Sequence, residues 1–520
     1  MYNDKKAQKV LTPLFLISAF ITSAFAIWAI ISPNQLTLSL SVIQQFFVIN
    51  YGWFLMLLPV LFAIICLFFG FSKKYRHIRL GGTDSRPKFS TFSWLAMLFT
   101  AGIGIGIVYF GINQPLYAYY LSPMGISNTS VSQMEAARHA MGMGVYLWGI
   151  GAWVIFSIAG LVVGYFVYTH GGKYLPGEAI TMGFGSKKWA KPVSQTMNIL
   201  SVVCAALTIA TTIGLGVIQM SGGIKKLFLI PDNISSILPF IILAILFVLF
   251  TSAAVTPLQK GMKIIGNINM YMAIGIMVFV MVFGPTRFIF EQIVTTFGTF
   301  IDTLIVQNFE MYIFSEQQSF VYDWAATGWL WWISWTPFMG VFVASISYGR
   351  TLKEYAIATM TAPVAFMILW ICTFGGTAML NVIQGDGSLS QIAMSTPDMT
   401  FFALLDTLPF SQLTTIFTLV LILFFLATTC TGCSVSLSTM TDLEGKTNSA
   451  TRAGVWSVLM SIIAIAAIVA TFRGGNDAFN GIKALATTMT IPYLVFFIIS
   501  ISAFIKQIVV DNKEMSKEVI

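Results

Sequence analysis

The sequence predicts an all-α, polytopic membrane protein with twelve transmembrane helices. Of its 520 residues, 57% are hydrophobic and only 9% are charged, and soluble globular domains do not have this balance. The mean hydropathy of +0.83 agrees. Apolar runs long enough to cross a bilayer as helices recur along the whole chain, since a span requires about 20 residues. Together these observations exclude an ordinary soluble protein.

The predicted spans follow one another with short connections. The first is too long, and too well followed by others, to be a cleaved signal peptide. The twelve spans are expected near residues 11–32, 51–71, 92–111, 141–169, 192–220, 235–254, 263–284, 328–347, 355–376, 411–437, 453–472 and 484–505. One membrane domain therefore occupies 11–505, between a short arm at 1–10 and a tail at 506–520.

Lysines and arginines predict the orientation. With both ends of the chain in the cytoplasm, all but six of the 28 fall on the cytoplasmic side. The exceptions are Arg138, Lys225, Lys226, Arg287, Arg473 and Lys483. This asymmetry follows the positive-inside rule and selects an even number of spans, as expected of a multi-pass cell-membrane protein with cytoplasmic termini. Insertion thus accounts for the net charge of +8, and nucleic-acid binding is the poorer explanation.

The longest external connection runs from about 285 to 327 and mixes apolar with acidic residues. Its 287–306 part is amphipathic enough to form an interfacial helix that lies along the bilayer. A simple linker would be more polar. We therefore expect an interfacial helix there.

The five cysteines all lie within predicted spans, and their spacing indicates neither a disulfide framework nor a zinc site. Cys430 and Cys433 form a C-x-x-C motif, but no nearby charge would stabilise a thiolate there. Buried free thiols are the expected state.

Aromatic residues are concentrated in two spans. Four of the thirteen tryptophans lie between 329 and 335, and Trp148, Trp153 and Phe156 lie in the 141–169 span. An aromatic face attracts a cation through its quadrupole and needs no counter-charge, which suits a quaternary ammonium held away from water. Aromatics on two spans could therefore make a cage for a methylated ammonium compound.

Two spans have the composition of broken helices. The segment 99–115 carries glycines at 102, 104, 106 and 111, which weaken a helix and expose its backbone. A second weak point surrounds Pro337, five spans later. Breaks at corresponding places in two halves point to the central site of a transporter. Close helix packing is the alternative explanation for the glycines.

The chain resembles the betaine/choline/carnitine transporter (BCCT) family along nearly its full length. The 331–355 stretch is the most specific match, whereas the glycine motif alone would not be specific. The matching stretches are PKFSTFSWLAMLFTAGIGIGIVYFGINQPLYAYY at 87–120, WGIGAW at 148–153, GLGVIQ at 214–219, WWISWTPFMGVFVASISYGRTLKEY at 331–355 and FFLATTCTGCS at 424–434. The resemblance implies two inverted five-helix repeats, spans 3–7 and 8–12, after two extra N-terminal helices. It also implies a homotrimer.

The family's aromatic box would map onto Trp148, Trp153, Phe156 and Trp332. Phe156 stands where the family often has tyrosine, which removes a hydroxyl but keeps the ring face. Further positions that the resemblance places at the substrate are Trp335, Ile103, Gly104 and Gly106, and those that it places along the pathway are Phe338 and Phe342.

The resemblance also implies a sodium site between the third and tenth spans. Backbone carbonyls and two hydroxyls would hold the ion, and hard oxygen ligands suit a small alkali cation. The matching residues are Thr100, Ile103, Phe425, Thr428 and Thr429. As an alternative, these threonines only bond the preceding turn of their helices. A second site is doubtful, because Ala205 and Ile209 occupy its expected hydroxyl positions, with Thr208 one residue away.

The absence of acidic residues from three spans indicates the charge of the substrate. No acidic residue lies in the 92–111, 141–169 or 328–347 spans. Choline-selective relatives often place an aspartate where Gly106 stands, because choline carries a net positive charge. A zwitterion brings its own carboxylate and needs no such partner. We therefore expect a zwitterionic substrate, with glycine betaine the leading candidate.

The predicted function is secondary active import of a quaternary-ammonium compound, coupled to sodium, by alternating access. The alternatives are a sodium-independent exchanger of carnitine or betaine type and a proton-coupled choline importer. A channel is disfavoured because bulky aromatics would occlude it. An enzyme is the least favoured class, because no catalytic cluster lies within the spans, and no cofactor besides the coupling ion is expected.

Overall fold

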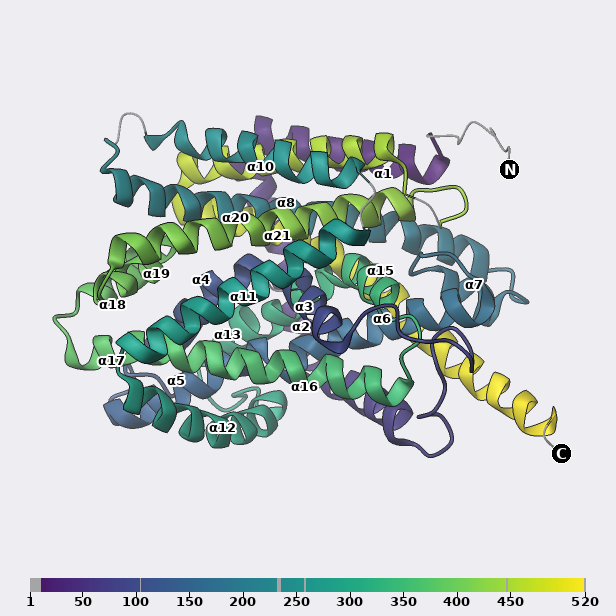
Figure 1. The fold of residues 1–520 in the computed structure, drawn as a ribbon, viewed down its shortest axis with the longest axis horizontal. Helices are drawn as coiled ribbons and strands as arrows, with labels where there is room; N and C mark the ends of the chain where they lie inside the picture. The colour runs from purple at the N-terminus through teal and green to yellow at the C-terminus, as the bar shows by residue number, and fades with distance from the viewer. Residues whose placement is uncertain (1–10, 103, 232–234, 257–258, 446–447, 519–520) are drawn as a thin grey trace.

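The computed structural model describes residues 11–102, 104–231, 235–256, 259–445 and 448–518, although not the side chains of 259–263, 470–483 and 515–518. Ile103 and the arm at 1–10 therefore lie outside the described residues. Every regular element in these ranges is a helix, apart from one isolated bridge between Arg79 and Thr351. Figure 1 shows many of the long helices running side by side along the longest axis of the molecule, while others cross them obliquely.

The first half of the chain forms ten described helices. They are α1 (Pro13–Ile31), α2 (Pro33–Phe71), α3 (Thr91–Gly102), α4 (Gly104–Leu121), α5 (Gln133–Trp148), α6 (Ile150–His170), α7 (Glu178–Phe184), α8 (Ala190–Phe228), α10 (Leu238–Val255) and α11 (Gln259–Phe283).

The second half contains α-helices together with short π- and 3₁₀-segments. They are α12 (Thr286–Phe309), α13 (Gln318–Phe320), η1 (Val321–Ala326), α14 (Thr327–Ser334), α15 (Thr336–Ile346), α16 (Leu352–Trp370), η2 (Ile371–Gly375), α17 (Gly376–Gln384), α18 (Ser388–Ser395), η3 (Pro397–Met399), α19 (Thr400–Asp406), α20 (Ser411–Met440) and α21 (Ala450–Glu518).

Eleven described helices are long and apolar enough to cross a membrane, or thirteen if each of two bent pairs counts as a span. The count is twelve when α12 is set aside as the predicted interfacial helix. The protein is therefore an all-α polytopic membrane protein, as predicted. Residues after 505 continue α21 to Glu518, so the predicted tail begins as helix and not as a separate arm.

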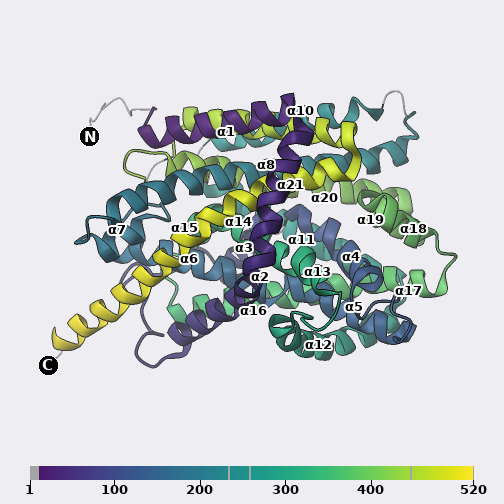
Figure 2. The same cartoon turned by 180° about the vertical axis from the view of Figure 1, so that it is seen from behind.

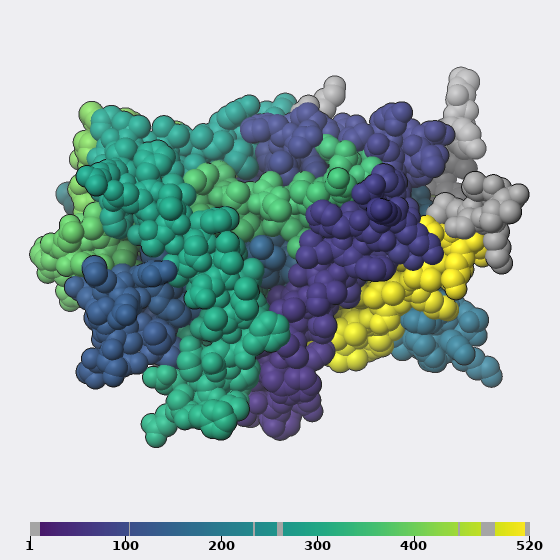
Figure 3. All heavy atoms as spheres, turned by 90° about the horizontal axis from the view of Figure 1, so that it is seen from below, coloured from purple at the N-terminus to yellow at the C-terminus, as the bar shows by residue number. Residues whose placement is uncertain are grey.

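The face of α12 that packs on the protein is rich in threonine, and several large apolar side chains lie on its exposed face. Thr296, Thr299 and Thr303 are buried, whereas Phe290 and Val294 are 56% and 75% exposed. A helix turned in this way is suited to contact lipid rather than water. Figure 3 shows α12 in teal at the surface beside α2 in purple, with the end of α21 in yellow on the other side of α2. Its angle to the bilayer stays a prediction.

Both predicted helix breaks are present. The axes of α3 and α4 differ by 67° on either side of residue 103, and the helix ending at Ser334 turns by 51° into α15. The second break lies at Trp335, and Pro337 falls in the first turn of α15, where a missing N–H costs nothing. A third interruption, at Gly149 between α5 and α6, was not predicted.

Contacts between helices follow the two predicted repeats. Spans 3 and 10 meet through α3, α4 and α20, while their counterparts 8 and 5 meet through α14, α15 and α8. In the same way α6 of span 4 packs on α15 of span 8, and α16 of span 9 packs on α3 and α4 of span 3. When each span in a contacting pair is replaced by its counterpart in the other repeat, five spans away, the new pair is also in contact. Two structural repeats would produce this pattern.

The two ends of the helix bundle are distinct. The start of α1 and the end of α21 lie at one end, and α17, α18 and α19 lie at the other (Figure 1). Figure 2 shows the same separation from behind. With the predicted cytoplasmic termini, the α18 and α19 end is the outer end, and we use that term below.

Candidate functional site

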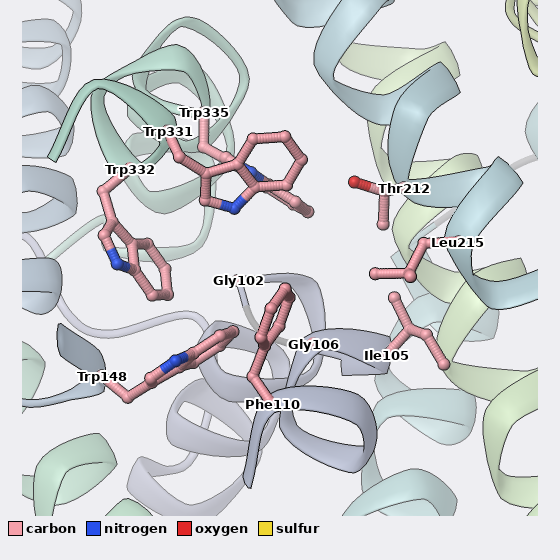
Figure 4. A pocket seen from close by; sticks show the side chains of 10 residues that line it. All are labelled: Gly102, Ile105, Gly106, Phe110, Trp148, Thr212, Leu215, Trp331, Trp332 and Trp335. Carbon is pink, nitrogen blue, oxygen red and sulfur yellow. The ribbon is translucent and has the colours of Figure 1, made fainter. Parts of the chain in front are cut away.

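A small cavity of about 20 Å³ lies where the two broken spans meet α5 and α8. This volume has space for about one water molecule, so the side chains around the cavity nearly fill it. Figure 4 shows the side chains around it. They are Gly102, Ile105, Gly106, Phe110, Trp148, Thr212, Leu215, Trp331, Trp332 and Trp335.

The glycines of the first broken span allow the aromatic rings to approach its backbone. A Cβ at Gly106 would lie 2.6 Å from the ring of Trp148, and one at Gly102 would lie 3.2 Å from Trp153. Both distances are shorter than ordinary contact. The small residues therefore let the ring of Trp148 rest on α4, and they leave helix backbone beside the cavity, as the sequence predicted for this segment.

The cavity tryptophans meet edge to face. The rings of Trp148 and Trp332 are 4.8 Å apart with planes at 80°, and those of Trp331 and Trp335 are 6.4 Å apart at 69°. Phe110 lies 5.3 Å from Trp148 at 32°. Edge-to-face pairing is favourable between aromatic quadrupoles, and it leaves ring faces free to meet a third group. The site is thus a cluster of ring faces assembled from three helices.

Two predicted box residues lie behind this cluster. Phe156 packs edge to face on Trp332 at 5.4 Å, and Trp153 packs on Phe156 at 5.8 Å. Both are fully buried, and neither lines the cavity. The structure therefore brings Trp148, Trp332 and Trp335 together at the cavity and places Trp153 and Phe156 one layer away. Their contact with substrate stays a prediction.

The two predicted pathway residues continue from Trp335 along α15. Phe338 lies 6.5 Å from Trp335 and 5.7 Å from Phe342. A Cβ at Gly432 of α20 would be 3.5 Å from Phe338 and 3.7 Å from Phe342, so both rings pack against that glycine. They form an aromatic layer between the cavity and the end of α15 at Ile346.

Few polar groups reach the cavity. Nε1 of Trp335 is buried without a hydrogen-bond partner. The hydroxyl of Thr212 donates to the carbonyl of Thr208 (3.0 Å), and Figure 4 shows its oxygen directed toward the tryptophans. No acidic side chain lines the cavity among the described residues. Ring faces and a few donors, rather than fixed negative charge, therefore define its chemistry.

The predicted sodium ligands are largely brought together. The Thr429 hydroxyl points to the carbonyl of Thr100 across 3.4 Å, which joins α20 to the last turn of α3. A Cβ at Gly104 would lie 3.1 Å from Oγ1 of Thr429 and 3.7 Å from the carbonyl oxygen of Phe425. Three oxygens thus converge on the break between α3 and α4. Ile103 lies outside the described residues.

Thr428 belongs to an adjacent network that contains a residue sequence reasoning missed. Its hydroxyl donates to the carbonyl of Phe424 (2.7 Å) and accepts from Nδ2 of Asn269 on α11 (2.9 Å). Oδ1 of Asn269 is buried without a partner. Asn269 therefore ties the seventh span to the tenth beside the predicted ion site. Its signal was a pair of asparagines, Asn267 and Asn269, in an apolar span, where buried polar side chains are costly unless they are used.

Phe110, Trp331, Thr212, Leu215 and Ile105 also line the cavity but were not among the predicted site residues. Trp331 belongs to the tryptophan run that drew attention to the span. Thr212 could not be identified from the sequence, because α8 is apolar and 94% of its most apolar 18-residue stretch is buried. A helix that is buried all round shows no polar face from which its orientation can be deduced.

A family model and known transporters match nearly the whole chain. The family model described as BCCT, betaine/carnitine/choline family transporter, matches residues 13–513. The glycine betaine transporter OpuD of Bacillus subtilis (strain 168) is 32% identical over 98% of this chain and 96% of its own. The high-affinity choline transport protein of Escherichia coli (strain K12) is 27% identical over 96% of this chain and 72% of its own. A crystal structure of MhsT in complex with L-phenylalanine aligns with a TM-score of 0.43 at 13% identity, covering 80% of this chain and 99% of that one.

Proposed function

This chain belongs to the betaine/carnitine/choline transporter family, and we propose that it imports a zwitterionic quaternary-ammonium compound, glycine betaine first, by sodium-coupled alternating access. Family membership makes it a transporter and not an enzyme. The observation that supports the substrate class is the cavity of tryptophan faces at the junction of two broken spans, without an acidic side chain in its lining.

The ring faces would bind the ammonium group. A methylated ammonium cannot donate hydrogen bonds, so a carboxylate offers it only charge, whereas an indole face offers charge attraction and apolar contact together. Trp148 and Trp332 meet at right angles, so a group that touches the face of one also touches the edge of the other. This arrangement favours a compact, methyl-covered cation over a flat or hydrogen-bonding one.

The substrate carboxylate would find donors on the opposite side. Nε1 of Trp335 is an unpaired buried donor, and an unpaired donor costs roughly 1–3 kcal/mol until a partner arrives. The Thr212 hydroxyl can exchange its bond to the Thr208 carbonyl for one to the ligand. A zwitterion would satisfy these donors, whereas choline would offer only a hydroxyl. Hence glycine betaine is the leading candidate.

Sodium binding would act on the same broken span. Its ligands would come from the Thr100 carbonyl, the Thr429 hydroxyl and the Phe425 carbonyl, with Thr428 and Ile103 completing the predicted set. A cation held there would pin α20 to the end of α3, and the neighbouring turn of α4 lines the cavity through Gly106. Ion and substrate would thus each stabilise the arrangement that the other needs, and coupling of this kind is reciprocal.

Uptake by purified protein in liposomes tests the proposal. Labelled glycine betaine, carnitine and choline are supplied under an inward sodium gradient, under potassium, and under a proton gradient alone. We expect accumulation of betaine only with sodium. Equal rates in sodium and potassium, together with counterflow from preloaded vesicles, would establish the exchanger. Choline uptake driven by protons would establish the remaining alternative, which the choline-transporting relative makes a real competitor.

A further inference from the structure

The ninth span lies against both halves of the broken third span. Its first part, α16, packs on α3 and α4, and the π-turn η2 that follows packs on α4. Phe366 on α16 meets Phe99 on α3, with ring centroids 4.4 Å apart and planes at 64°. Trp370 stands four residues later, on the same face of α16, and reaches α4. Two rings one helical turn apart therefore contact the two sides of the break.

Trp370 is bonded to the turn of α4 that lines the cavity. Its indole Nε1 donates to the carbonyl of Ile107 across 3.0 Å, and its side chain is fully buried. Ile107 directly follows Ile105 and Gly106, which line the cavity, although Trp370 itself does not. Other buried tryptophans have an Nε1 without a hydrogen-bond partner, namely Trp153, Trp329 and Trp335. The bond to Ile107 is therefore a specific feature of Trp370 and not a property of every indole in the bundle.

A glycine one turn further along α4 makes room for this bond. A Cβ at Gly111 would lie 2.6 Å from both Cδ1 and Nε1 of Trp370, so any side chain there would displace the indole. The backbones also come close, because a Cβ at Gly375 of η2 would lie 2.8 Å from the carbonyl oxygen of Gly111. Small residues allow helices in membranes to approach in this way. Gly111 thus forms a notch in α4 that accepts the indole of Trp370.

Aromatic rings hold the indole on its other sides. It stacks on Phe366 at 6.1 Å and 25°, and on Phe401 of α19, at the outer end, at 6.3 Å and 20°. Phe374 in η2 lies 4.3 Å away at 38°. The π-turn begins at Ile371, directly after Trp370, and turns of this kind are rare and frequently lie at functional sites. Packing therefore fixes the direction of the indole N–H group.

We propose that Trp370 is a positioning residue for substrate binding, which fixes α4 in the cavity wall without touching the substrate. Its bond to Ile107 holds the turn that contains Gly106, and the ring of Trp148 rests on Gly106. Phe366 supports the α3 side of the break through its contact with that helix. The inference rests on the proposed function, since affinity for a quaternary-ammonium substrate is its measure.

Two substitutions separate the hydrogen bond from the ring. Trp370→Phe keeps an aromatic ring and removes the N–H group. Trp370→His keeps a ring N–H, because Nε2 of an imidazole takes the place of the indole Nε1, but it leaves a larger void. The Kd for glycine betaine, from calorimetry on purified protein in detergent, should rise about threefold to tenfold in Trp370→Phe, the range of one net hydrogen bond, and less in Trp370→His.

The order of the two variants distinguishes positioning from a purely structural role. The melting temperature should fall more in Trp370→His than in Trp370→Phe, because the larger void costs more stability. A purely structural tryptophan would lose affinity in that same order, whereas a positioning bond gives the reverse order. The Kd for choline should rise by the same factor as that for betaine, since the bond fixes the shape of the cavity and not its charge.

Gly111→Ala provides an independent route to the same loss. Its methyl group would push the indole away from the Ile107 carbonyl, so the Kd should rise as in Trp370→Phe. Because both substitutions remove one bond, their effects should combine to less than the sum of the two. Gly164→Ala is the matched control, since a Cβ there would meet Ala344 at 3.5 Å, an ordinary contact.

Trp456→Phe is the control for removing a buried indole N–H group. Its Nε1 donates to the Thr441 hydroxyl at 3.2 Å, and neither residue lines the cavity, so the Kd should keep its wild-type value. An unchanged Kd in Trp370→Phe, or in Gly111→Ala should the first variant not fold, would overturn the inference. So would an equal rise in Trp456→Phe, or an order of affinities that follows stability. Wild-type protein that binds no quaternary-ammonium compound would instead refute the proposed function.

Discussion

At the scale of single residues, the site depends on aromatic ring faces and on glycines that let these rings approach the backbone. Trp332 holds the central position, because it meets Trp148 at 4.8 Å and Phe156 at 5.4 Å. The ring of Trp332 therefore borders the ring of Trp148 inside the cavity. The ring of Trp332 also covers the layer in which Trp153 and Phe156 are buried.

Trp332→Ala should abolish saturable uptake while the protein still inserts. A desolvated cation–π contact contributes about 2 kcal/mol or more, so affinity should fall at least roughly thirtyfold. Phenylalanine or tyrosine at 332 should keep part of it. Binding by purified protein gives the measurement, and Trp324→Ala is the control, since Trp324 stacks on Phe320 and does not line the cavity. Normal affinity in Trp332→Ala would remove this ring from the cage.

Gly106→Asp should shift preference from glycine betaine toward choline. The new carboxylate would repel that of betaine and attract the bare cation in a site that screens charge weakly. The structure adds a cost, because any side chain at 106 displaces the ring of Trp148. Gly106→Asn has nearly the same shape without the charge, so the ratio of choline to betaine affinity between the two variants isolates the charge. Equal ratios would show that residue 106 does not act electrostatically on the substrate.

At the scale of elements, the break between α3 and α4 connects two functions. Its inner edge meets α20 through Thr100 and Thr429, and its outer edge lines the cavity through Gly106. A helix interrupted at this point can respond to an ion on one side and a solute on the other. An uninterrupted helix would satisfy its own carbonyls and offer neither.

Replacing Thr428 and Thr429 together with alanine should raise the sodium concentration for half-maximal uptake, with a smaller effect at saturating sodium. Of the single variants, Thr429→Ala should have the larger effect, because its hydroxyl faces the Thr100 carbonyl whereas that of Thr428 is engaged by Asn269. Thr431→Ala, on the same helix but bonded to Phe250, serves as the control. Sodium titrations of initial uptake give the result. The same half-maximal concentration in the double variant would exclude these hydroxyls as ligands.

At the scale of the whole molecule, the predicted orientation places the termini and the α18–α19 end on opposite sides of the membrane. The five native cysteines are all buried, so introduced cysteines can report each side separately. A membrane-impermeant maleimide should label Asp386→Cys in intact cells, and Lys188→Cys only after permeabilisation. Both positions are exposed. The reverse pattern would show that the predicted topology is inverted.

Much of the architecture was accessible from the sequence because it depends on composition over long windows. Three of these features are local: the twelve apolar runs, the glycines near residue 103 and the proline near the second break. The stability of a helix depends on its own residues, so these features can be identified without knowledge of the fold. The concentration of tryptophan on two spans likewise predicted an aromatic site, and four of those tryptophans line the cavity: Trp148, Trp332 and Trp335, which were predicted site residues, and Trp331, which was not.

What only the tertiary structure decided is which side of each buried helix faces the cavity. Two of the spans that build the site are buried on all sides. In the most apolar 18-residue stretch of each, 89% of the residues are buried for α5 with α6, and 94% for α8. Apolar residues therefore occur on every side of these helices. Periodicity cannot then separate Trp148 and Thr212, which line the cavity, from Trp153, which does not. The packing of α4 on α5 and of α14 on α8 decides this, because it depends on contacts between residues far apart in the chain.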